Sequence, residues 1–334
     1  MKVLVTGGTG FLGRRLVEHL APRHALRLLV RPGSSRERFP AGVEIAAGDV
    51  TDPGSLLQAA TGCDAVVHAA ALVKILAPAA LFDRINGGGL ENVLAAAAEA
   101  GVRKIVYVSS FIALGPSESG PGGLLDESAE PRERPWINDY ERTKTRSDRR
   151  ARQAIAEGVP LDVVYPGVLY GPGELTEGNL VVRHLLDLLH RRLPFLIGAP
   201  GRRWSYAQVD DVARGIGAAL ERAGAGERYV LGGDNVTLGE FYATVERLSG
   251  VPVPRRRLPD GVAKAMGAAA KLQARLTGAT PKLTPDLVEV YRHDWAYSSA
   301  RAARDLGFRV RPLCDGLAEV LDWLRASGQW RPTA

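Results

Sequence analysis

Short apolar runs alternate with helical patterns over the first half of this 334-residue chain. The runs KVLVTGG, LRLLVR, VEIAAGDV, AVVHAAA and KIVYVSS are rich in Val, Ile and Leu, and helical patterns begin near Phe11 and at LENVLAAAAEAG. Strands that are apolar along their whole length are buried on both faces, and strands that alternate with helices pair in parallel. The alternation therefore predicts an α/β fold with a doubly wound parallel sheet.

The pattern becomes less regular after LDVVYPGVLYGPG. Beyond that point we expect helices in NLVVRHLLDLLHRR, EFYATVERLSG and AEVLDWLRASG, a loop around Trp204, and a strand in RYVLGG. Residues 1–171, together with about 205–232, are predicted to form the sheet domain, and residues 172–334 mainly a smaller substrate-binding lobe. No internal repeat or low-complexity linker separates the two parts, so we expect the second lobe to be built onto the first.

Composition narrows the class of protein. Hydrophobic residues make up 46% of the chain, and 43 Lys and Arg residues stand against 37 Asp and Glu residues. We interpret the excess of +6 as dispersed, which suits an anionic cofactor better than nucleic acid, so no nucleic-acid partner is expected. Cys63 and Cys314 have neither metal-site nor redox spacing. With strand-like residues at the very start and no long apolar run, we expect a cytoplasmic protein that binds no metal and is not inserted in a membrane.

The segment TGGTGFLG lies between a predicted strand and a predicted helix. Its glycines, Gly7, Gly10 and Gly13, would let the backbone approach a pyrophosphate and place that anion at a helix N-terminus, where amide groups and the helix dipole favour it. This context predicts a dinucleotide site.

The end of the second predicted strand suggests which dinucleotide. Arg31 stands where an acidic residue would hold an adenosine ribose, and Ser34 and Arg36 follow. An arginine with nearby hydroxyl groups suits a ribose 2′-phosphate, so NADP is predicted, with NAD as the alternative if Arg31 only stacks on adenine. Asp49, beside Val50, could accept a hydrogen bond from the adenine amine or could cap a helix.

Taken together, these segments resemble the extended short-chain dehydrogenase/reductase family, whose fold contains a Rossmann sheet. The resemblance covers nearly the whole chain through TGGTGFLG, GDV, HAAA, VYVSSFIALG, YERTK, YPGVLYGPG, VDDVARG, GERYVLGG and YSSARAARDLGF. It is greatest to a branch of dihydroflavonol-reductase-like and 3β-hydroxysteroid-dehydrogenase-like proteins, which includes bacterial sugar epimerases. The resemblance implies an NAD(P)-dependent enzyme and a homodimer.

The family's catalytic residues match Ser110, Tyr140 and Lys144. The resemblance also implies a set of cofactor contacts: Gly7, Thr9, Gly10, Phe11, Leu12, Gly13, Asp49, Val50, Ala69, Ala70, Ala71, Asn86, Ser109, Tyr140, Lys144, Pro166, Gly167 and Val168. For Asn86, support of a proton relay and a simple helix N-cap remain alternatives.

Tyr140 and Lys144 lie four positions apart in NDYERTKTRSDRRARQAIAEG, which we predict to be helical. Residues at this spacing share one helix face. Tyr140 would then exchange a proton with a substrate oxygen, with Lys144 lowering its pKa and Ser110 hydrogen-bonding the reacting oxygen.

The substrate is less well indicated. Sugar-nucleotide enzymes of the family carry an arginine where this chain has Trp204, with Arg203 one residue away, whereas Asn179 resembles a phosphate-contacting asparagine of those enzymes. We expect a mostly apolar substrate wall, formed by Leu72, Val73, Phe111, Ile112, Trp136, Leu169 and Trp204. A hydrophobic ketone or alcohol is therefore the predicted substrate, and a nucleotide-sugar epimerase or a non-catalytic cofactor sensor are the alternatives.

The segment GVAKAMGAAAKLQARLTG, residues 261–278, is predicted to be an amphipathic helix with Lys and Arg on one side. Three placements remain open: over the mouth of the substrate site, against a lipid surface, or packed on the protein.

Overall fold

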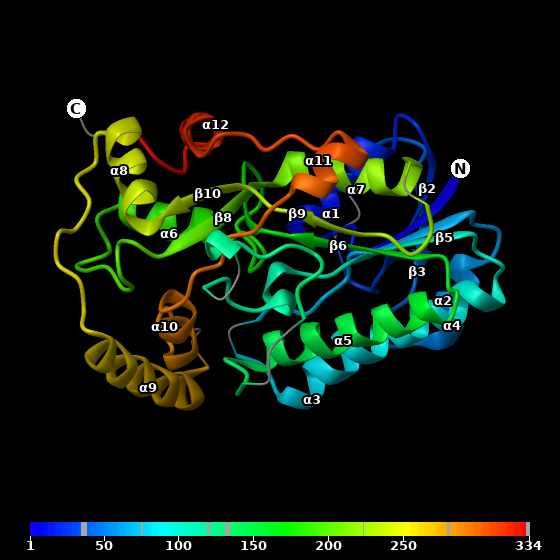
Figure 1. Ribbon diagram of the computed structural model, residues 1–334, viewed down its shortest axis with the longest axis horizontal. Coiled ribbons are helices and arrows are strands. Elements are labelled where there is room, and N and C mark those ends of the chain that lie inside the picture. Colours follow the sequence, from blue (N-terminus) through cyan, green and yellow to red (C-terminus); the bar gives the residue numbers. More distant parts are fainter. Residues whose placement is uncertain are drawn as a thin grey trace.

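The computed structural model describes residues 1–34, 39–74, 76–118, 121–130, 134–222, 224–278 and 281–331. Seven parallel strands form its main sheet, in the order β3-β2-β1-β4-β5-β6-β9 (Figure 1). The strands are β1 (Lys2–Thr6), β2 (Ala25–Val30), β3 (Glu44–Ala47), β4 (Ala65–His68), β5 (Lys104–Val108), β6 (Leu161–Pro166) and β9 (Arg228–Leu231). The predicted α/β class and doubly wound parallel sheet are confirmed.

Helices cover both faces of this sheet. One face carries α1 (Phe11–Leu20), α7 (Val209–Arg222) and α11 (Ala300–Leu306); the other carries α2 (Pro53–Ala60), α3 (Ala79–Phe82), α4 (Gly89–Glu99) and α5 (Asp139–Ala156). A π-helical turn, Asp83–Gly88, joins α3 to α4. The two apolar clusters under these layers are separate, as expected for a sheet buried on both faces.

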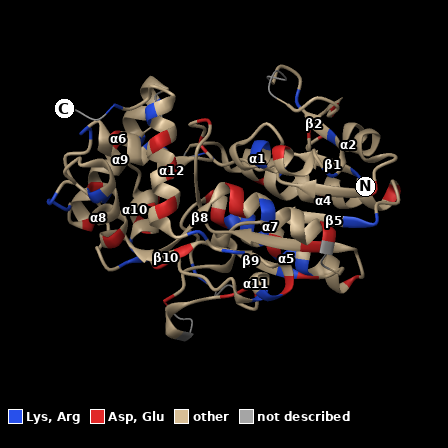
Figure 2. Ribbon diagram, turned by 90° about the horizontal axis from the view of Figure 1, so that it is seen from above, with Lys and Arg blue, Asp and Glu red and all other residues tan. Residues whose placement is uncertain are grey.

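The second lobe is built around a small mixed sheet of three strands. Its order is β10-β8-β7, with β8 antiparallel to β10 and parallel to β7. The strands are β7 (Val168–Tyr170), β8 (Arg203–Gln208) and β10 (Asp234–Thr237), and the helices are α6 (Leu180–Leu189), α8 (Leu238–Ser249), α9 (Asp260–Thr277), α10 (Pro285–Tyr291) and α12 (Leu313–Ala326). Figure 2, seen from above, places these helices together at one end of the molecule.

The chain crosses between the two parts more than once. After β8 in the small sheet, α7 and β9 return to the large sheet, and the chain then leaves it again for β10. The loop expected around Trp204 is wrong, because that segment is β8, the middle strand of the small sheet. Its side chains are buried from Trp204 to Gln208 on both faces, so the sequence lacks the alternation that marks a half-exposed strand.

Two features of this architecture bear on the site. The turns after β1, β4, β5 and β6 all leave the carboxyl edge of one parallel sheet, where ligands of such folds bind. Nowhere in the described part of the chain is a helix both long enough and apolar enough to cross a bilayer.

Candidate active site

The glycine turn after β1 is shaped by close approach of backbone. Gly7 has φ +77°, and a Cβ there would lie 2.6 Å from the backbone nitrogen of Ala70. A Cβ on Gly13 would lie 2.0 Å from the carbonyl oxygen of Gly7. Helix α1 starts with Gly10 as N-cap, without a side-chain cap and without an acidic residue in its first turn. These residues fit a pyrophosphate, since amide groups at the helix start are free of side-chain caps and the first turn of α1 carries no carboxylate.

The structure describes some of the residues predicted to bind the adenosine part of the cofactor. Arg31 follows β2 and is exposed, and its carbonyl oxygen accepts a hydrogen bond of 3.1 Å from the amide of Ser34. Arg36 lies outside the described residues. The Oδ1 of Asp49 accepts a hydrogen bond of 2.8 Å from the amide of Thr51, while Asp52 is the residue that caps α2. The cap alternative for Asp49 is therefore wrong, and its contact with adenine stays a prediction.

Asn86 links the loop after β4 to the tyrosine helix. Its Oδ1 accepts from the amide of Leu72 at 2.7 Å, and its Nδ2 donates to the hydroxyl of Thr143 on α5 at 3.1 Å. The residue lies in the middle of the π-helical turn, so it is not a helix N-cap. With Ala69 and Ala70 held by hydrogen bonds to Thr6, this bridge fixes the cofactor side of the site.

Ser110 and Tyr140 come from different elements and meet at the carboxyl edge of β5. Ser110 is the N-cap of a 3-10 helix, Phe111–Leu114, and Tyr140 lies in the first turn of α5, whose N-cap is Asn138. The Ser110 side chain lies close enough to Tyr140 to act on the pKa of its phenol. Burial raises the pKa of Tyr140 above its ordinary value, although Ser110 acts in the opposite direction.

Lys144 lies one turn after Tyr140 and is almost fully buried. Its Nζ donates to the carbonyl oxygen of Val108 at 3.0 Å and sits 5.1 Å from the centre of the Tyr107 ring. Burial lowers the pKa of Lys144 to about 7. We predicted that Lys144 lowers the pKa of Tyr140. Without a bound nucleotide this effect is not found, because the Lys144 ammonium group donates to the carbonyl oxygen of Val108 and its own pKa is lowered.

Two buried rings behind Lys144 were not among the predicted site residues. His68 stacks on Tyr107 with ring centres 5.7 Å apart, and its Nδ1 lies 2.8 Å from the hydroxyl of Thr6. Burial and the nearby Lys144 lower the pKa of His68 to about 3, so the ring is neutral. The signal in the sequence was slight: His68 opens HAAA, and Tyr107 precedes the serines in VYVSS.

The remaining predicted cofactor contacts line the same edge. Pro166, Gly167 and Val168 form the junction of β6 and β7, and the amide of Gly167 donates to Leu231 of β9 at 3.0 Å. Ser109 is buried at the end of β5, directly before Ser110. Thr9, Phe11 and Leu12 lie in the glycine turn and the start of α1, and Val50 and Ala71 follow β3 and β4. Their contact with a cofactor stays a prediction.

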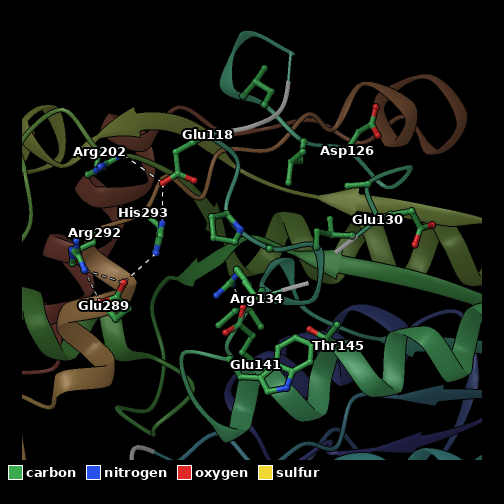
Figure 3. A pocket seen from close by; sticks show the side chains of 18 of the residues that line it. Glu118, Asp126, Glu130, Arg134, Glu141, Thr145, Arg202, Glu289, Arg292 and His293 are labelled. Carbon is green, nitrogen blue, oxygen red and sulfur yellow. Dashed lines mark hydrogen bonds and ion pairs between the residues drawn. The ribbon is translucent and has the colours of Figure 1, made fainter. Parts of the chain in front are cut away.

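A cavity of about 860 Å³ lies beside this edge, on the neighbouring face of α5 (Figure 3). Glu141 and Thr145 line it, whereas Tyr140 and Ser110 do not. Its apolar lining residues are Ile112, Leu114, Leu124, Leu125 and Trp136, and Asp126, Glu130, Arg134 and Glu141 also line it. Ion pairs form one charged side: Glu118 contacts Arg202 and His293, and Glu289 contacts His293 and Arg292.

Of the predicted substrate residues, only Ile112 and Trp136 are among those found to line this cavity. The lining is mixed, not mostly apolar, because distant segments bring Glu118, Glu289 and His293 to it. Phe111 instead packs against Trp295 and Tyr297. Leu169 packs against the apolar core beside α1, and Leu72 is held by Asn86, while Val73 lies in the same loop.

Three residues bear on the sugar-nucleotide alternative: Trp204 in the place of the family's arginine, its neighbour Arg203, and Asn179. Each has a partner within the protein. Trp204 is buried, with its ring 4.6 Å from that of Tyr291 and its Nε1 donating to the carbonyl oxygen of His293 at 3.2 Å. The guanidinium group of Arg203 donates to the carbonyl oxygens of Gly122 and Gly123. Asn179 is fully buried and donates to the carbonyl oxygen of Gly171 at 3.1 Å.

Comparison with known proteins places this geometry in a family. A model described as the NAD dependent epimerase/dehydratase family matches residues 3–232. Sterol demethylase protein B of Methylococcus capsulatus is 30% identical over 334 residues, covering 98% of this chain and 99% of that protein. A 3 beta-hydroxysteroid dehydrogenase/Delta 5-->4-isomerase of Mycobacterium tuberculosis is 29% identical over 325 residues, covering 92% and 85%.

A solved structure described as a nucleoside-diphosphate-sugar epimerase from Pseudomonas aeruginosa superposes with a TM-score of 0.74 at 25% identity, covering 99% of each chain. The similar proteins thus include both steroid-related enzymes and a sugar epimerase, so they leave the substrate open. The chain belongs to the NAD dependent epimerase/dehydratase family, and it is an NAD(P)-dependent enzyme of the extended short-chain dehydrogenase/reductase type.

Proposed function

We propose that this enzyme is an NADP-dependent oxidoreductase that interconverts a ketone and a secondary alcohol on a hydrophobic small molecule. The observation that carries the proposal is the approach of Ser110 to Tyr140 at the carboxyl edge of the sheet, with Lys144 one turn away. A phenol and a hydroxyl that converge on one point can bind and protonate a carbonyl oxygen.

When bound, the nicotinamide nucleotide would supply or accept the hydride. In the reducing direction Tyr140 would donate its phenolic proton to the substrate oxygen, and Ser110 would hold that oxygen by a hydrogen bond. Lys144 would contribute in its charged form, which favours the phenolate left behind. Because burial brings its pKa to about 7, the charged fraction of Lys144 would fall as pH rises above neutrality.

The choice of NADP rests on Arg31, which is exposed at the end of β2 with Ser34 nearby. A guanidinium group can pair with a 2′-phosphate in two-pronged geometry. Arg31→Asp should weaken NADPH binding about tenfold or more, measured by fluorescence titration, and leave NADH binding unchanged or improved. Arg103→Asp, with the same change of charge at the opposite sheet edge, is the control. Equal affinity of the parent for both nucleotides would remove this part of the proposal.

Three features support a hydrophobic substrate. Trp204, Arg203 and Asn179 have internal partners and are not free to contact a sugar diphosphate. Two of the similar proteins have names that refer to sterols or steroids. Apolar residues, including Ile112 and Trp136, form part of the lining of the cavity beside α5, and burying one aromatic-sized group against them would contribute roughly 1.5–3 kcal/mol.

The test compares two substrate classes with purified protein. Steroid-sized or flavonoid-sized ketones and secondary alcohols should react with a stoichiometric change in NADPH absorbance, and UDP-sugars should neither react nor protect against heat. Trp136→Ala should lower kcat/KM for the apolar substrate about tenfold or more, whereas Trp323→Ala on α12, away from the cavity, should not. Trp204→Arg would not distinguish the two substrate classes, since Trp204 is buried in the core.

Epimerisation of a nucleotide sugar is the second candidate. It is favoured by the similarity to a sugar epimerase and by the side chains of Arg202 and Arg292 at the charged side of the cavity. If UDP-glucose and UDP-galactose are interconverted without net change in absorbance, this candidate replaces the oxidoreductase.

A further inference from the structure

Helix α9 presents apolar side chains to solvent. Seven large apolar residues of the described chain are strongly exposed, and four of them lie on this one helix: Val262, Met266, Leu272 and Leu276. Leu272 is 60% exposed and Leu276 is 82% exposed. A concentration of this kind marks a surface that contacts something apolar.

The exposed residues form one stripe. At 100° per residue, positions 262, 265, 266, 269, 272 and 276 fall on the same side of the helix, and all six are exposed apolar residues. The opposite side packs on the protein through small residues, Ala263, Gly267 and Ala274. A Cβ on Gly267 would lie 2.8 Å from the carbonyl carbon of Thr284, so the helix is pressed closely against the start of α10.

Ion pairs hold the helix in this orientation. Lys264 binds Glu289 at 2.6 Å and Lys271 binds Asp286 at 3.2 Å, and both carboxylates belong to α10. The helix therefore cannot turn its apolar stripe inward without breaking its packed face. Packing and ion pairs therefore fix the exposure of the apolar stripe.

The segment around α9, residues 255–282, carries as much net positive charge as the whole chain. Residues 255–282 contain seven of the 43 Lys and Arg residues and only one of the 37 Asp and Glu residues. This segment alone accounts for the formal excess of +6, and the rest of the chain is balanced at 36 of each sign. In the fold, carboxylates of other segments pair with four of these seven cations: Arg255, Lys264, Lys271 and Lys282 contact Glu246, Glu289, Asp286 and Asp187. Three arginines of this segment are exposed: Arg255 and Arg256 precede α9 in the chain, and Arg275 lies in its last turn.

We propose that α9 docks the protein on the surface of an anionic lipid bilayer. The stripe would enter the boundary between headgroups and acyl chains, and the exposed Arg255, Arg256 and Arg275 would lie among anionic headgroups. A second copy of the chain fits less well, because pairing two stripes would bring together the exposed Arg255, Arg256 and Arg275 of both copies. The 18 residues of α9 are long enough for a stripe of about 27 Å.

The position of α9 gives this docking a consequence. The helix lies at the end of the second lobe, beside α10 and far from the N-terminal strands (Figure 1). Its first residue, Asp260, lines the cavity beside α5 together with Glu289 and Arg292. A bilayer under α9 would thus lie close to that cavity, where an apolar substrate could arrive from the lipid. This consequence rests on the proposed function, but the docking itself does not.

The experiment measures binding of the full chain to vesicles, without substrate or nucleotide. The protein should sediment with vesicles of phosphatidylcholine and phosphatidylglycerol, bind phosphatidylcholine alone far more weakly, and be released as salt is raised. The double variant Leu272→Gln, Leu276→Gln should bind at least about tenfold more weakly. Val310→Gln, which alters an exposed apolar residue outside α9, should bind like the parent.

A second double variant, Arg255→Glu with Arg256→Glu, tests the charge separately and should abolish the preference for anionic vesicles. Thermal melting of each variant verifies folding. Failure of the parent to bind anionic vesicles would overturn the proposal, as would unchanged binding of the leucine variant. If that variant instead converts a dimer to a monomer in sedimentation velocity while the parent ignores vesicles, a second copy covers the stripe. Substrate turnover takes no part in these readouts, so they stand apart from a failure of the proposed reaction.

Discussion

Helices α5 and α9 have the same length, 18 residues, and depart from the usual distribution of side chains in opposite directions. Helix α5 buries charged and polar side chains: Glu141, Thr143, Lys144, Thr145, Ser147 and Asp148. Helix α9 buries small residues and exposes four large apolar ones. Polar groups inside and apolar groups outside both cost free energy, so each helix points to a role other than stability.

The free-energy cost of these side chains is offset by hydrogen bonds on α5 but not on α9. On α5 the buried groups have specific partners: the Oδ1 of Asp148 accepts from the Tyr165 hydroxyl at 2.5 Å, Glu141 accepts from the amide of Ile137 at 2.6 Å, and Ser147 donates to the carbonyl oxygen of Asn86 at 3.1 Å. On α9 the stripe has no such partners within the described chain. The polar groups of α5 are therefore satisfied within the protein, whereas the apolar stripe of α9 would be covered only by a partner outside the chain.

The largest effect is expected from breaking the network of α5. Asp148→Ala should lower the free energy of unfolding by roughly 3–5 kcal/mol, because it leaves Arg152 and the Tyr165 hydroxyl without their buried partner. Urea unfolding measures the change. Asp322→Ala removes an exposed carboxylate paired with Arg325 on α12 and should cost less than about 0.5 kcal/mol. Equal costs for the two would show that the α5 network is not structural.

Lys144→Met should stabilise the nucleotide-free protein by roughly 2–4 kcal/mol near pH 7 while abolishing turnover, since this buried ammonium group donates to the carbonyl oxygen of Val108 and has no ion pair with a carboxylate in the described part of the chain. The sign follows from its pKa, which is lowered from 10.5 to about 7. The folded parent bears the full penalty below about pH 7 and loses it as pH rises toward 10.5, so the stabilisation by Met should shrink over that range. A variant that melts below the parent at pH 7 would contradict this.

Tyr140→Phe should lower turnover by at least about 10²-fold, which corresponds to about 2.7 kcal/mol, because the proton donor is removed while the ring remains. Nucleotide binding and melting temperature should stay close to those of the parent. Tyr229→Phe on β9 is the matched control and should retain activity. Parent-like turnover by the Tyr140 variant would place the proton donor elsewhere.

The smallest effect is expected on the outer side of α9. Leu272→Gln with Leu276→Gln should change the free energy of unfolding by less than about 0.5 kcal/mol, because these side chains contact little of the protein. Gly267→Leu on the packed side of the same helix should cost roughly 1–3 kcal/mol, since a Cβ there already meets the backbone at Thr284. Urea unfolding compares the two variants, and a similar loss in both would mean that the stripe packs on the chain itself.

Both helices were visible in the sequence, but to different degrees. The spacing of Tyr140 and Lys144 predicted that the two residues share one face of α5, and the structure adds that Asn138, two positions before Tyr140, caps this helix. Local signals suffice there, because i,i+4 spacing involves residues of one turn. For α9 the pattern predicted an amphipathic helix, but a helical period does not say which side meets the protein.

The sequence by itself determined the α/β class, the parallel sheet and the glycine turn, because these depend on local periodicity and short motifs. The family resemblance added Ser110, Tyr140 and Lys144 as the predicted catalytic set. Tertiary structure decided the rest. It made a buried strand of the Trp204 segment, turned the ammonium of Lys144 toward Val108, and brought Glu118 to His293 across 175 positions. Such contacts join segments remote along the chain, and the energies of burial and of charge pairing that fix them depend on surroundings that no local pattern encodes.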